Sequence, residues 1–93
     1  MPYESYEWDE DKRLSNLAKH EIDFEAILDF DWDNAVTEPS PRENELRYIA
    51  ISYLRDRLYT VIYTERDNRR RIISLRRPSR RERRHYERHI RPY

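Results

Sequence analysis

The fold is decided by one stretch of the chain, LRYIAISYLRDRLYTVIYTERDNRRRIISLRR (residues 46–77). Three runs within it, 46–54, 58–65 and 71–77, are rich in Ile, Val, Tyr and Thr, which favour strands. The linkers between the runs are only three and five residues long, which suits hairpin loops. The stretch therefore predicts an antiparallel meander of three strands.

A helix is predicted ahead of the meander. Asp9 can cap a helix over 10–19, which carries acidic residues in its first turn and a lysine in its last, as the helix dipole favours. Its apolar residues Leu14, Leu17 and Ala18 share one face. We expect this face to pack on the sheet.

Shorter elements fill the segments around this helix. Asp23 can cap a second helix over 24–30. Residues 3–8 and 35–38 are predicted to form brief strands. Residues 39–44, PSPREN, have the composition of a loop, which leads into the meander.

A last helix is predicted after the meander. Pro78 ends the third strand, because it cannot continue the ladder. Ser79, with Glu82 three residues later, has the spacing of a capping box. The helix is expected to run to about Arg91, with a thin apolar stripe that includes Tyr86.

The order of these elements predicts the fold class α+β, a small antiparallel β-sheet with N-terminal helices and a C-terminal helix on one face. At 93 residues the chain is expected to form a single domain, 1–93. Charged residues make up 41%, but the 13% of aromatic residues are spread along the chain, which indicates a folded core. Since Gly is absent, tight turns are expected to use Asn, Asp, His or Pro.

The chain has no Cys, which excludes a disulfide framework and a thiolate metal site and fits a reducing cytoplasm. Its first residues lack the basic and apolar regions of a signal peptide. No apolar run approaches the roughly 20 residues that cross a bilayer. We therefore expect a cytoplasmic location and no contact with a membrane.

The charge is divided between the two halves of the chain. Residues 1–45 hold 14 acidic and four basic residues, whereas 46–93 hold five acidic residues and 15 arginines. The acidic half could simply fold onto the basic half. The use of Arg throughout the second half favours a polyanion-binding surface, because guanidinium groups match phosphate geometry and stack on bases.

Four stretches carry a resemblance to a known family: EWDEDKRLSNLAKH (7–20), DFEAILDF (23–30), RIISLRR (71–77) and SRRERRHYE (79–87). Together they resemble the BrnT family, the ribonuclease toxins of bacterial type II toxin–antitoxin systems. The resemblance covers the chain from about Tyr6 to Glu87. One position departs from the family pattern, since Glu21 stands where Gly usually follows the Lys-His pair.

The resemblance implies a fold like that of RelE-type toxins and an endoribonuclease activity. We expect this activity to need no cofactor or metal. It implies RNA as the substrate and a BrnA-like antitoxin with a ribbon-helix-helix DNA-binding part as the partner. The chain would then meet DNA only through the antitoxin. For Glu21, it implies either a left-handed residue at some energetic cost or a different helix end.

Cleavage of RNA by its own 2′-OH needs a base, positive charge on the phosphorane and an acid for the 5′-oxygen. Strict alternation in 71–77 places Arg71 and Arg77 on the face opposite Arg76. We predict that Arg76 and Arg71 stabilise the phosphate or transition state. The clamps on the substrate would be Arg77, Arg80, Arg81 and Arg84. For each arginine, the alternative is a solvated or antitoxin-facing side chain.

Candidates for proton transfer are fewer. Glu65, at a strand end, could be the base, or it could pair with Arg66 or Arg71. Tyr86 could stack on a base or donate a proton, or it could belong to the core, which its place in the apolar stripe favours.

The histidines have several possible roles. Lys19 and His20 belong to the motif of the resemblance, which makes them candidates for RNA binding, although His20 also suits a helix end. His85 and His89 have the i, i+4 spacing of a metal pair, but no third ligand is evident, so we predict no metal site.

Two other classes of function compete with the ribonuclease. A non-catalytic protein could use the same Arg-rich surface to bind RNA or an acidic partner, which the absence of an unmistakable base favours. A DNA-binding module is disfavoured, because the chain shows no helix-turn-helix or ribbon pattern of its own. Cleavage of RNA would separate the first rival from the ribonuclease.

Overall fold

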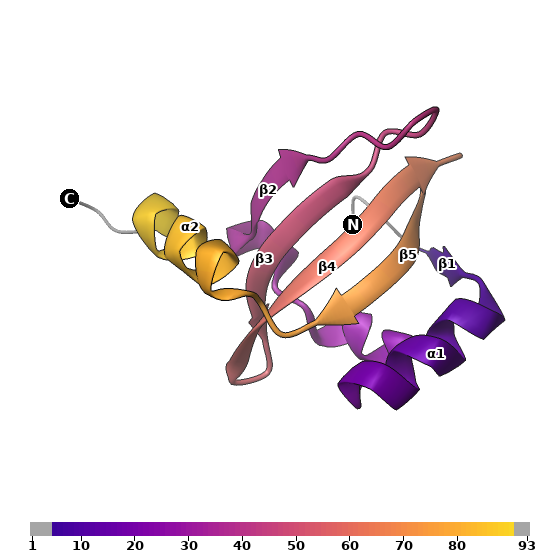
Figure 1. Ribbon diagram of the computed structural model, residues 1–93, viewed down its shortest axis with the longest axis horizontal. Helices are drawn as coiled ribbons and strands as arrows, with labels where there is room; N and C mark the ends of the chain where they lie inside the picture. Colours follow the sequence, from indigo (N-terminus) through magenta and orange to yellow (C-terminus); the bar gives the residue numbers. More distant parts are fainter. Residues whose placement is uncertain (1–4, 91–93) are drawn as a thin grey trace.

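The computed structural model describes residues 5–90 and has an α+β fold (Figure 1). Its elements, in chain order, are β1 (Tyr6–Trp8), α1 (Glu10–His20), the 3-10 helices η1 (Phe24–Asp29) and η2 (Trp32–Asn34), β2 (Val36–Pro39), β3 (Tyr48–Leu54), β4 (Arg57–Arg66), β5 (Arg69–Arg76) and α2 (Arg80–Ile90). Every predicted element is present. The ends predicted at Tyr3 and Arg91 lie outside the described residues.

The elements form one five-stranded sheet in the order β1-β5-β4-β3-β2. The meander β3-β4-β5 and the pairing of β2 with β3 are antiparallel, as expected. The edge strand β1 pairs with β5 in parallel, which makes the sheet mixed. Two strands joined by a hairpin must pair in an antiparallel way. Because β1 and β5 are far apart in the sequence and no hairpin joins them, they can pair in either direction.

The helices do not share one face of the sheet, contrary to the prediction. On one face, η1 contributes Phe24 and Ile27 to the main core. On the other face, Tyr86 of α2 packs with Ile51 and Leu58 in a second, smaller cluster. We call these the η1 face and the α2 face. Because side chains alternate along a strand, each face of β3 and β4 can hold its own apolar cluster.

The first helix lies beside the edge of β5 and does not cover the sheet with its leucines. Leu14 and Leu17 are 51% and 37% exposed, so the predicted packing of the Leu14, Leu17 and Ala18 face is wrong. The buried residue of α1 is Asn16. Its amide nitrogen donates to the Leu75 carbonyl at 2.8 Å, and its carbonyl oxygen accepts from the Leu75 N–H at 3.2 Å. The Asn16 side chain thus makes the two hydrogen bonds with the Leu75 backbone that a neighbouring strand would otherwise make.

A bulge in β5 changes the face of several side chains. Tyr63 pairs with Ile72 and Ile62 pairs with Ser74, so Ile73 has no partner on β4. Ile72 and Leu75, three residues apart, are both fully buried in the same core. The prediction that side chains in 71–77 alternate strictly between the two faces is therefore wrong.

Arg71 and Arg76 lie on the same face of the sheet because of this bulge. Arg71 pairs with Thr64 and Arg76 pairs with Thr60. The two threonines are four residues apart on β4, which keeps them on one face. Thr60 contacts α2 through its hydroxyl, so this is the α2 face.

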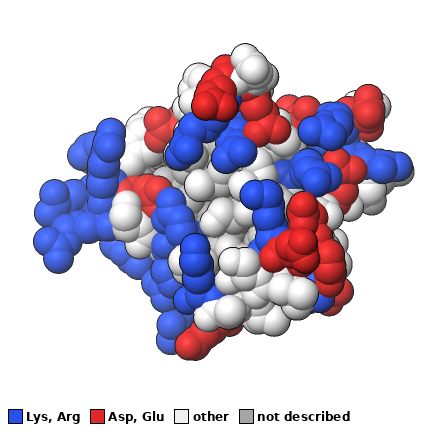
Figure 2. Space-filling model, turned by 45° about the vertical axis from the view of Figure 1, so that its right-hand side comes forward, with Lys and Arg blue, Asp and Glu red and all other residues white. Residues whose placement is uncertain are grey.

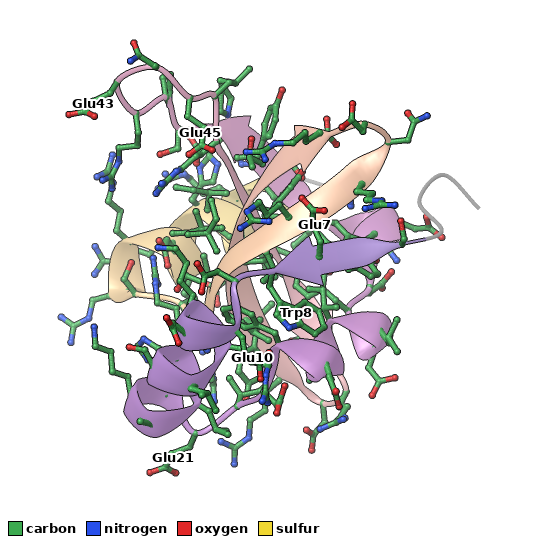
Figure 3. All side chains as sticks on the ribbon, turned by 90° about the vertical axis from the view of Figure 1, so that its right-hand side faces the viewer. Glu7, Trp8, Glu10, Glu21, Glu43 and Glu45 are labelled. Atoms are coloured by element: carbon green, nitrogen blue, oxygen red, sulfur yellow. The ribbon has the colours of Figure 1, made fainter. Side chains whose placement is uncertain are left out.

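Turns without glycine use left-handed residues of unexpected kinds. Asp67 and Asn68 have positive φ in the β4–β5 hairpin, as the absence of Gly led us to expect. Glu21 also has positive φ, which is the first of the two helix ends expected for it, whereas positive φ at Glu43 and Arg55 was not expected. Glu21 ends α1 with φ 60° and ψ 32°, and its N–H donates to the Leu17 carbonyl. The side chain extends from the end of the helix (Figure 3).

Replacing Glu21 with Gly is expected to stabilise the fold by about 1 kcal/mol, because Gly carries no steric cost in the left-handed region. Thermal unfolding should show a melting temperature about 4–8 °C higher, as a domain of this size converts that energy. Lys12→Gly, at an exposed position within the same helix, should lower the temperature by a similar amount. An unchanged or lower melting temperature for Glu21→Gly would contradict a left-handed helix end.

Candidate nucleic-acid interface

The junction between β5 and α2 is held by a cluster of polar groups around Glu82. The Arg76 guanidinium donates to both carboxylate oxygens, at 2.8 and 2.9 Å. The Thr60 hydroxyl and the Ser79 N–H donate to the Oε1 atom at 3.0 and 2.9 Å. Ser79 completes the predicted capping box, since its hydroxyl accepts from the Glu82 N–H at 3.1 Å. The cluster fixes α2 on the sheet.

The protonation of this cluster follows from its hydrogen bonds. Burial alone would raise the pKa of Glu82, but hydrogen bonds from Arg76, Ser79 and Thr60 outweigh it and lower the pKa to about 2. The hydrogen bonds from Arg76 to Glu82 raise the pKa of the guanidinium against the opposing effect of burial. Arg76 is therefore a fixed cation whose nearest counter-charge is part of the fold.

Arg71 lies further along the same face and has its own acidic neighbour. Its guanidinium is 3.3 Å from Glu7 of β1, and Arg69 approaches the same carboxylate at 3.6 Å. Glu7 and Trp8 point to opposite sides of β1, so the carboxylate stays on the α2 face while the indole enters the core (Figure 3). Two arginines share one carboxylate here, which leaves an excess of positive charge.

Glu65 lies on the other face of the sheet, away from Arg71 and Arg76. It pairs with Arg70 in the ladder, and the two side chains are 3.6 Å apart. The Arg70 guanidinium stacks on the Trp32 ring at 3.8 Å from its centroid. The structure thus joins Glu65 to the aromatic cluster of the η1 face and not to the predicted phosphate-binding arginines.

Tyr86 is 5% exposed and forms the centre of the small core under α2. Its ring meets that of Tyr53 edge-on at 6.2 Å, and burial raises the pKa of its hydroxyl. Tyr86 therefore belongs to the core, as its position in the apolar stripe of the sequence indicated. A contact with an RNA base would require α2 to leave the sheet.

The outer side of α2 carries exposed arginines. Arg80, Arg84 and Arg88 follow one another at i, i+4 spacing, so they form a row, and Arg81 lies beside it. Within the described residues, none of these four makes an ion pair. Figure 2 shows the basic side chains gathered on this side of the molecule. We call these four residues the α2 arginine row.

The row is unfavourable for the helix itself. Arg80 and Arg81 occupy the first turn, where the helix dipole favours acidic residues. Like charges at i, i+4 also repel each other by a few tenths of a kcal/mol per pair. Sequences that break local rules at exposed positions usually do so for function. A bound polyanion would relieve both penalties.

The remaining predicted binding residues flank this surface. Arg77 is exposed and lies over the Tyr59 ring, 5.6 Å from its centroid. Lys19 and His20 are exposed in the last turn of α1. Because Asn16, one turn earlier, bonds to Leu75, this end of α1 lies beside the end of β5 that leads to Arg77.

A cleft between α2 and β2 brings together residues that the sequence analysis did not connect. Its volume is about 490 Å³, and it is lined by Glu38, Pro39, Ser40, Ile49, Ser79, Arg81, Glu82, His85 and Arg88. His85 Nε2 lies 3.2 Å from a carboxylate oxygen of Glu38. His85 had been considered only as a metal ligand with His89. Because 46 residues separate Glu38 from His85, the sequence carries no local signal for this pair.

No group of three or more His, Asp or Glu residues within 5–90 could hold a metal ion. His85 and His89 lie with their rings 4.2 Å apart, and the Nδ1 atom of His89 contacts the carbonyl of His85. In the same part of the chain, no helix is long and apolar enough to cross a membrane.

The comparisons with known proteins agree on one family. Residues 8–82 match the family described as ribonuclease toxin, BrnT, of type II toxin–antitoxin system. The crystal structure of the Brucella abortus ribonuclease toxin BrnT is similar, with a TM-score of 0.57 and 28% sequence identity over 82% of this chain and 97% of that chain. No curated protein sequence matches. The fold, the arginine-rich surface and the match over most of the chain agree: this chain belongs to the BrnT family of ribonuclease toxins of type II toxin–antitoxin systems.

Proposed function

We propose that this chain is an endoribonuclease toxin that cleaves RNA by attack of a 2′-OH on the adjacent phosphate, without a metal ion. The observation that carries the proposal is the α2 arginine row, a set of exposed guanidinium groups that make no ion pair among the described residues, on a helix that they destabilise. Single-stranded RNA offers phosphates for guanidinium pairing and bases for stacking. The family match supports RNA as the substrate.

The arginines divide into two groups by their surroundings. Within residues 5–90, Arg80, Arg81 and Arg84 make no ion pair that phosphate binding would break, so we assign them to substrate clamping. Arg77, Lys19 and His20 would contact the substrate at the edges of this surface. Arg71 and Arg76 are held by carboxylates on one face. They are roughly 13 Å apart, because their partners Thr64 and Thr60 are four residues apart on β4 at about 3.3 Å per residue.

With this spacing, the two arginines would contact different phosphates of one strand. Arg76, beside the helix that carries the clamps, is the better candidate for charge stabilisation at the scissile phosphate. Glu65 lies on the opposite face and Tyr86 lies in the core, so we give neither a part in the chemistry.

We also propose the partner that controls the toxin. A BrnA-like antitoxin would cover the α2 arginine row with acidic side chains and so exclude RNA. Its ribbon-helix-helix part would bind DNA, and the toxin would meet DNA only through it. Both proteins would act in the cytoplasm, where the RNA substrate is found.

The first test is cleavage of end-labelled single-stranded RNA in EDTA. We expect fragments with a 2′,3′-cyclic phosphate on one side and a 5′-OH on the other, because the 2′-oxygen displaces the 5′-oxygen. The same sequence with 2′-deoxy sugars should bind but stay intact. RNA that is bound and protected, both free and on translating ribosomes, would favour the non-catalytic binding protein instead.

A pair of variants tests the clamp within the same assay. Arg80→Gln with Arg84→Gln should flatten the salt dependence of RNA binding by about 1.4 in log–log slope, since each phosphate contact on a single strand contributes about 0.7. The matched control replaces Arg42 and Arg57, which are exposed on loops or strand ends outside the surface, and should keep the slope. Equal slopes for both pairs would contradict a clamp on α2.

A further inference from the structure

The geometry points to His85 as the general base of RNA cleavage, held in place by Glu38 in the cleft between α2 and β2. This inference rests on the proposed function and adds the proton-transfer group that the arginines cannot provide. Arginine keeps its proton under all conditions in proteins, so it can stabilise charge but cannot accept a proton. The base must therefore come from another side chain near the arginines.

The position of His85 meets the requirements of such a base. It lies one turn beyond Arg81 and about one turn before Arg88, and both arginines line the same cleft. The imidazole of His85 is thus on the helix side that also offers guanidinium groups to a phosphate. Glu65, the base suggested by sequence, lies on the opposite face of the sheet.

Glu38 acts as the positioning residue. Its carboxylate oxygen lies 3.2 Å from His85 Nε2, so an Nε2–H directed at Glu38 would leave Nδ1 as the nitrogen that can take a proton. A base whose ring is oriented by a third group is a recurring arrangement in nucleophilic catalysis. Glu38 comes from β2 and His85 from α2, so two separate elements of the fold build the pair.

The surroundings of the pair favour a nucleotide as the occupant. The charged and titratable groups around His85 are Glu38 from β2 and Arg81, Glu82, Arg88 and His89 from α2, while β3 contributes the apolar side chain of Ile49. Glu82 is already neutralised by Arg76. A cleft of about 490 Å³ lies within the usual range of about 300–1,000 Å³ for ligand sites, so it has room for one nucleotide.

The step itself is a transfer of one proton and an exchange at phosphorus. Nδ1 of His85 takes the proton of the 2′-OH, the 2′-oxygen forms a bond to phosphorus, and the bond from phosphorus to the 5′-oxygen breaks. Water protonates the departing 5′-oxygen, and the imidazolium returns its proton to the solvent. The products are the cyclic phosphate and the 5′-OH fragment, with no metal or cofactor consumed.

The variant His85→Gln should cleave at least about 100-fold more slowly in kcat, with KM changed little, because general base catalysis contributes at this scale. A general base acts only when it is unprotonated, so the rate of the intact protein should rise with pH along a limb that His85→Gln lacks. The matched control is His89→Gln on the same helix, whose side chain does not line the cleft. It should remain within about threefold of the intact protein.

Glu38→Gln should reduce kcat by about tenfold with KM unchanged, and Glu38→Asp should recover part of the loss, as expected of a positioning carboxylate. Thermal unfolding of each variant checks that α2 stays on the sheet. Binding of 2′-deoxy substrate should be equal in all variants.

The outcomes separate this inference from the proposed function. If the intact protein cleaves and His85→Gln cleaves equally fast with the same pH profile, His85 is not the base, while the ribonuclease assignment stands. If the intact protein does not cleave RNA, free or on ribosomes, both fail. The family match ends at residue 82, before His85, so a positive result would describe a property of this chain beyond that match.

Discussion

Replacing Glu82 with Gln is expected to lower the free energy of unfolding by about 2 kcal/mol at pH 7. The substitution removes the carboxylate to which Arg76 donates two hydrogen bonds. The guanidinium group then faces a neutral amide. Removing one partner of a partly buried ion pair costs more than the pair contributes, because the other charge stays desolvated. The same change weakens the capping box at the start of α2.

The pH dependence of this difference follows from the pKa of Glu82. The pKa in the folded protein is about 2, below its ordinary 4.5, so the carboxylate stabilises the fold above about pH 4.5 and loses this effect as pH falls through 2. The lowering corresponds to about 3 kcal/mol, which solvent screening of the partly exposed pair reduces to about 2. The difference between the intact protein and Glu82→Gln should shrink between pH 4.5 and 2.

Urea unfolding at a series of pH values measures the effect. Glu87→Gln, at an exposed position of the same helix with no ion pair among the described residues, is the matched control and should stay within about 0.5 kcal/mol. A difference for Glu82→Gln that stays constant from pH 7 down to pH 2 would show that charge does not hold α2 on the sheet.

The same cluster changes how a variant of Arg76 must be interpreted. Arg76→Ala would lose activity if the guanidinium contacts RNA, and also if α2 leaves the sheet because Glu82 has lost its partner. The double variant Arg76→Met with Glu82→Leu separates these causes, since an apolar pair can restore packing without charge. A stable but inactive double variant would assign Arg76 to the chemistry.

Local chemistry made much of the fold predictable from the sequence. The strands of the meander have β-branched and aromatic residues, and their hairpins are short. Asp9 and Asp23 cap their helices as predicted, and Ser79 forms the predicted capping box with Glu82. These features depend on residues within a few positions of each other, so sequence spacing is sufficient to find them.

Long-range packing could not be predicted in the same way. The face of the sheet that α2 covers depends on which side the chain crosses after Pro78, and Ser79 caps the helix equally well on either side. The bulge at Ile73 depends on the register between β4 and β5. A single extra residue reversed the expected relation of Arg71 to Arg76, because side chains alternate between faces.

The positive charge of the candidate site could be predicted from the sequence, but the residues proposed for proton transfer could not. A run of arginines in 80–88 is visible in the sequence, and in the structure the helix presents them outward. The pair of Glu38 and His85 joins two distant segments, and no sequence motif links the two residues. An isolated His and an isolated Glu have many structural roles, so only their proximity makes the pair a candidate.

Replacing Asn16 with Leu is expected to cost about 2–4 kcal/mol of stability, the second large effect. The amide of Asn16 pairs with both backbone groups of Leu75 and also donates to the Ile22 carbonyl at 3.3 Å. A leucine of similar size leaves the Leu75 N–H and C=O buried without partners, and each such group costs about 1–3 kcal/mol. The leucines of α1 were predicted to pack on the sheet, whereas the polar Asn16 makes this contact.

The variant Asn16→Asp distinguishes hydrogen bonding from packing. Its carboxylate could still accept from the Leu75 N–H, but it would face the carbonyls of Leu75 and Ile22 without a proton to donate. Such a carboxyl has a raised pKa in the folded state, so its destabilisation should shrink as pH falls and the protonated form donates again. Asn16→Leu should show no such recovery.

Urea unfolding of both variants at pH 7 and pH 4.5 measures this, beside Ser15→Leu as a matched control at an exposed neighbouring position. Ser15→Leu should change stability by less than about 0.5 kcal/mol. A cost for Asn16→Leu no larger than that of the control would show that the edge of β5 does not need a polar partner. If the cost is large, Asn16 of the stretch EWDEDKRLSNLAKH has a structural role, and it sets the position of Lys19 and His20 beside the end of β5.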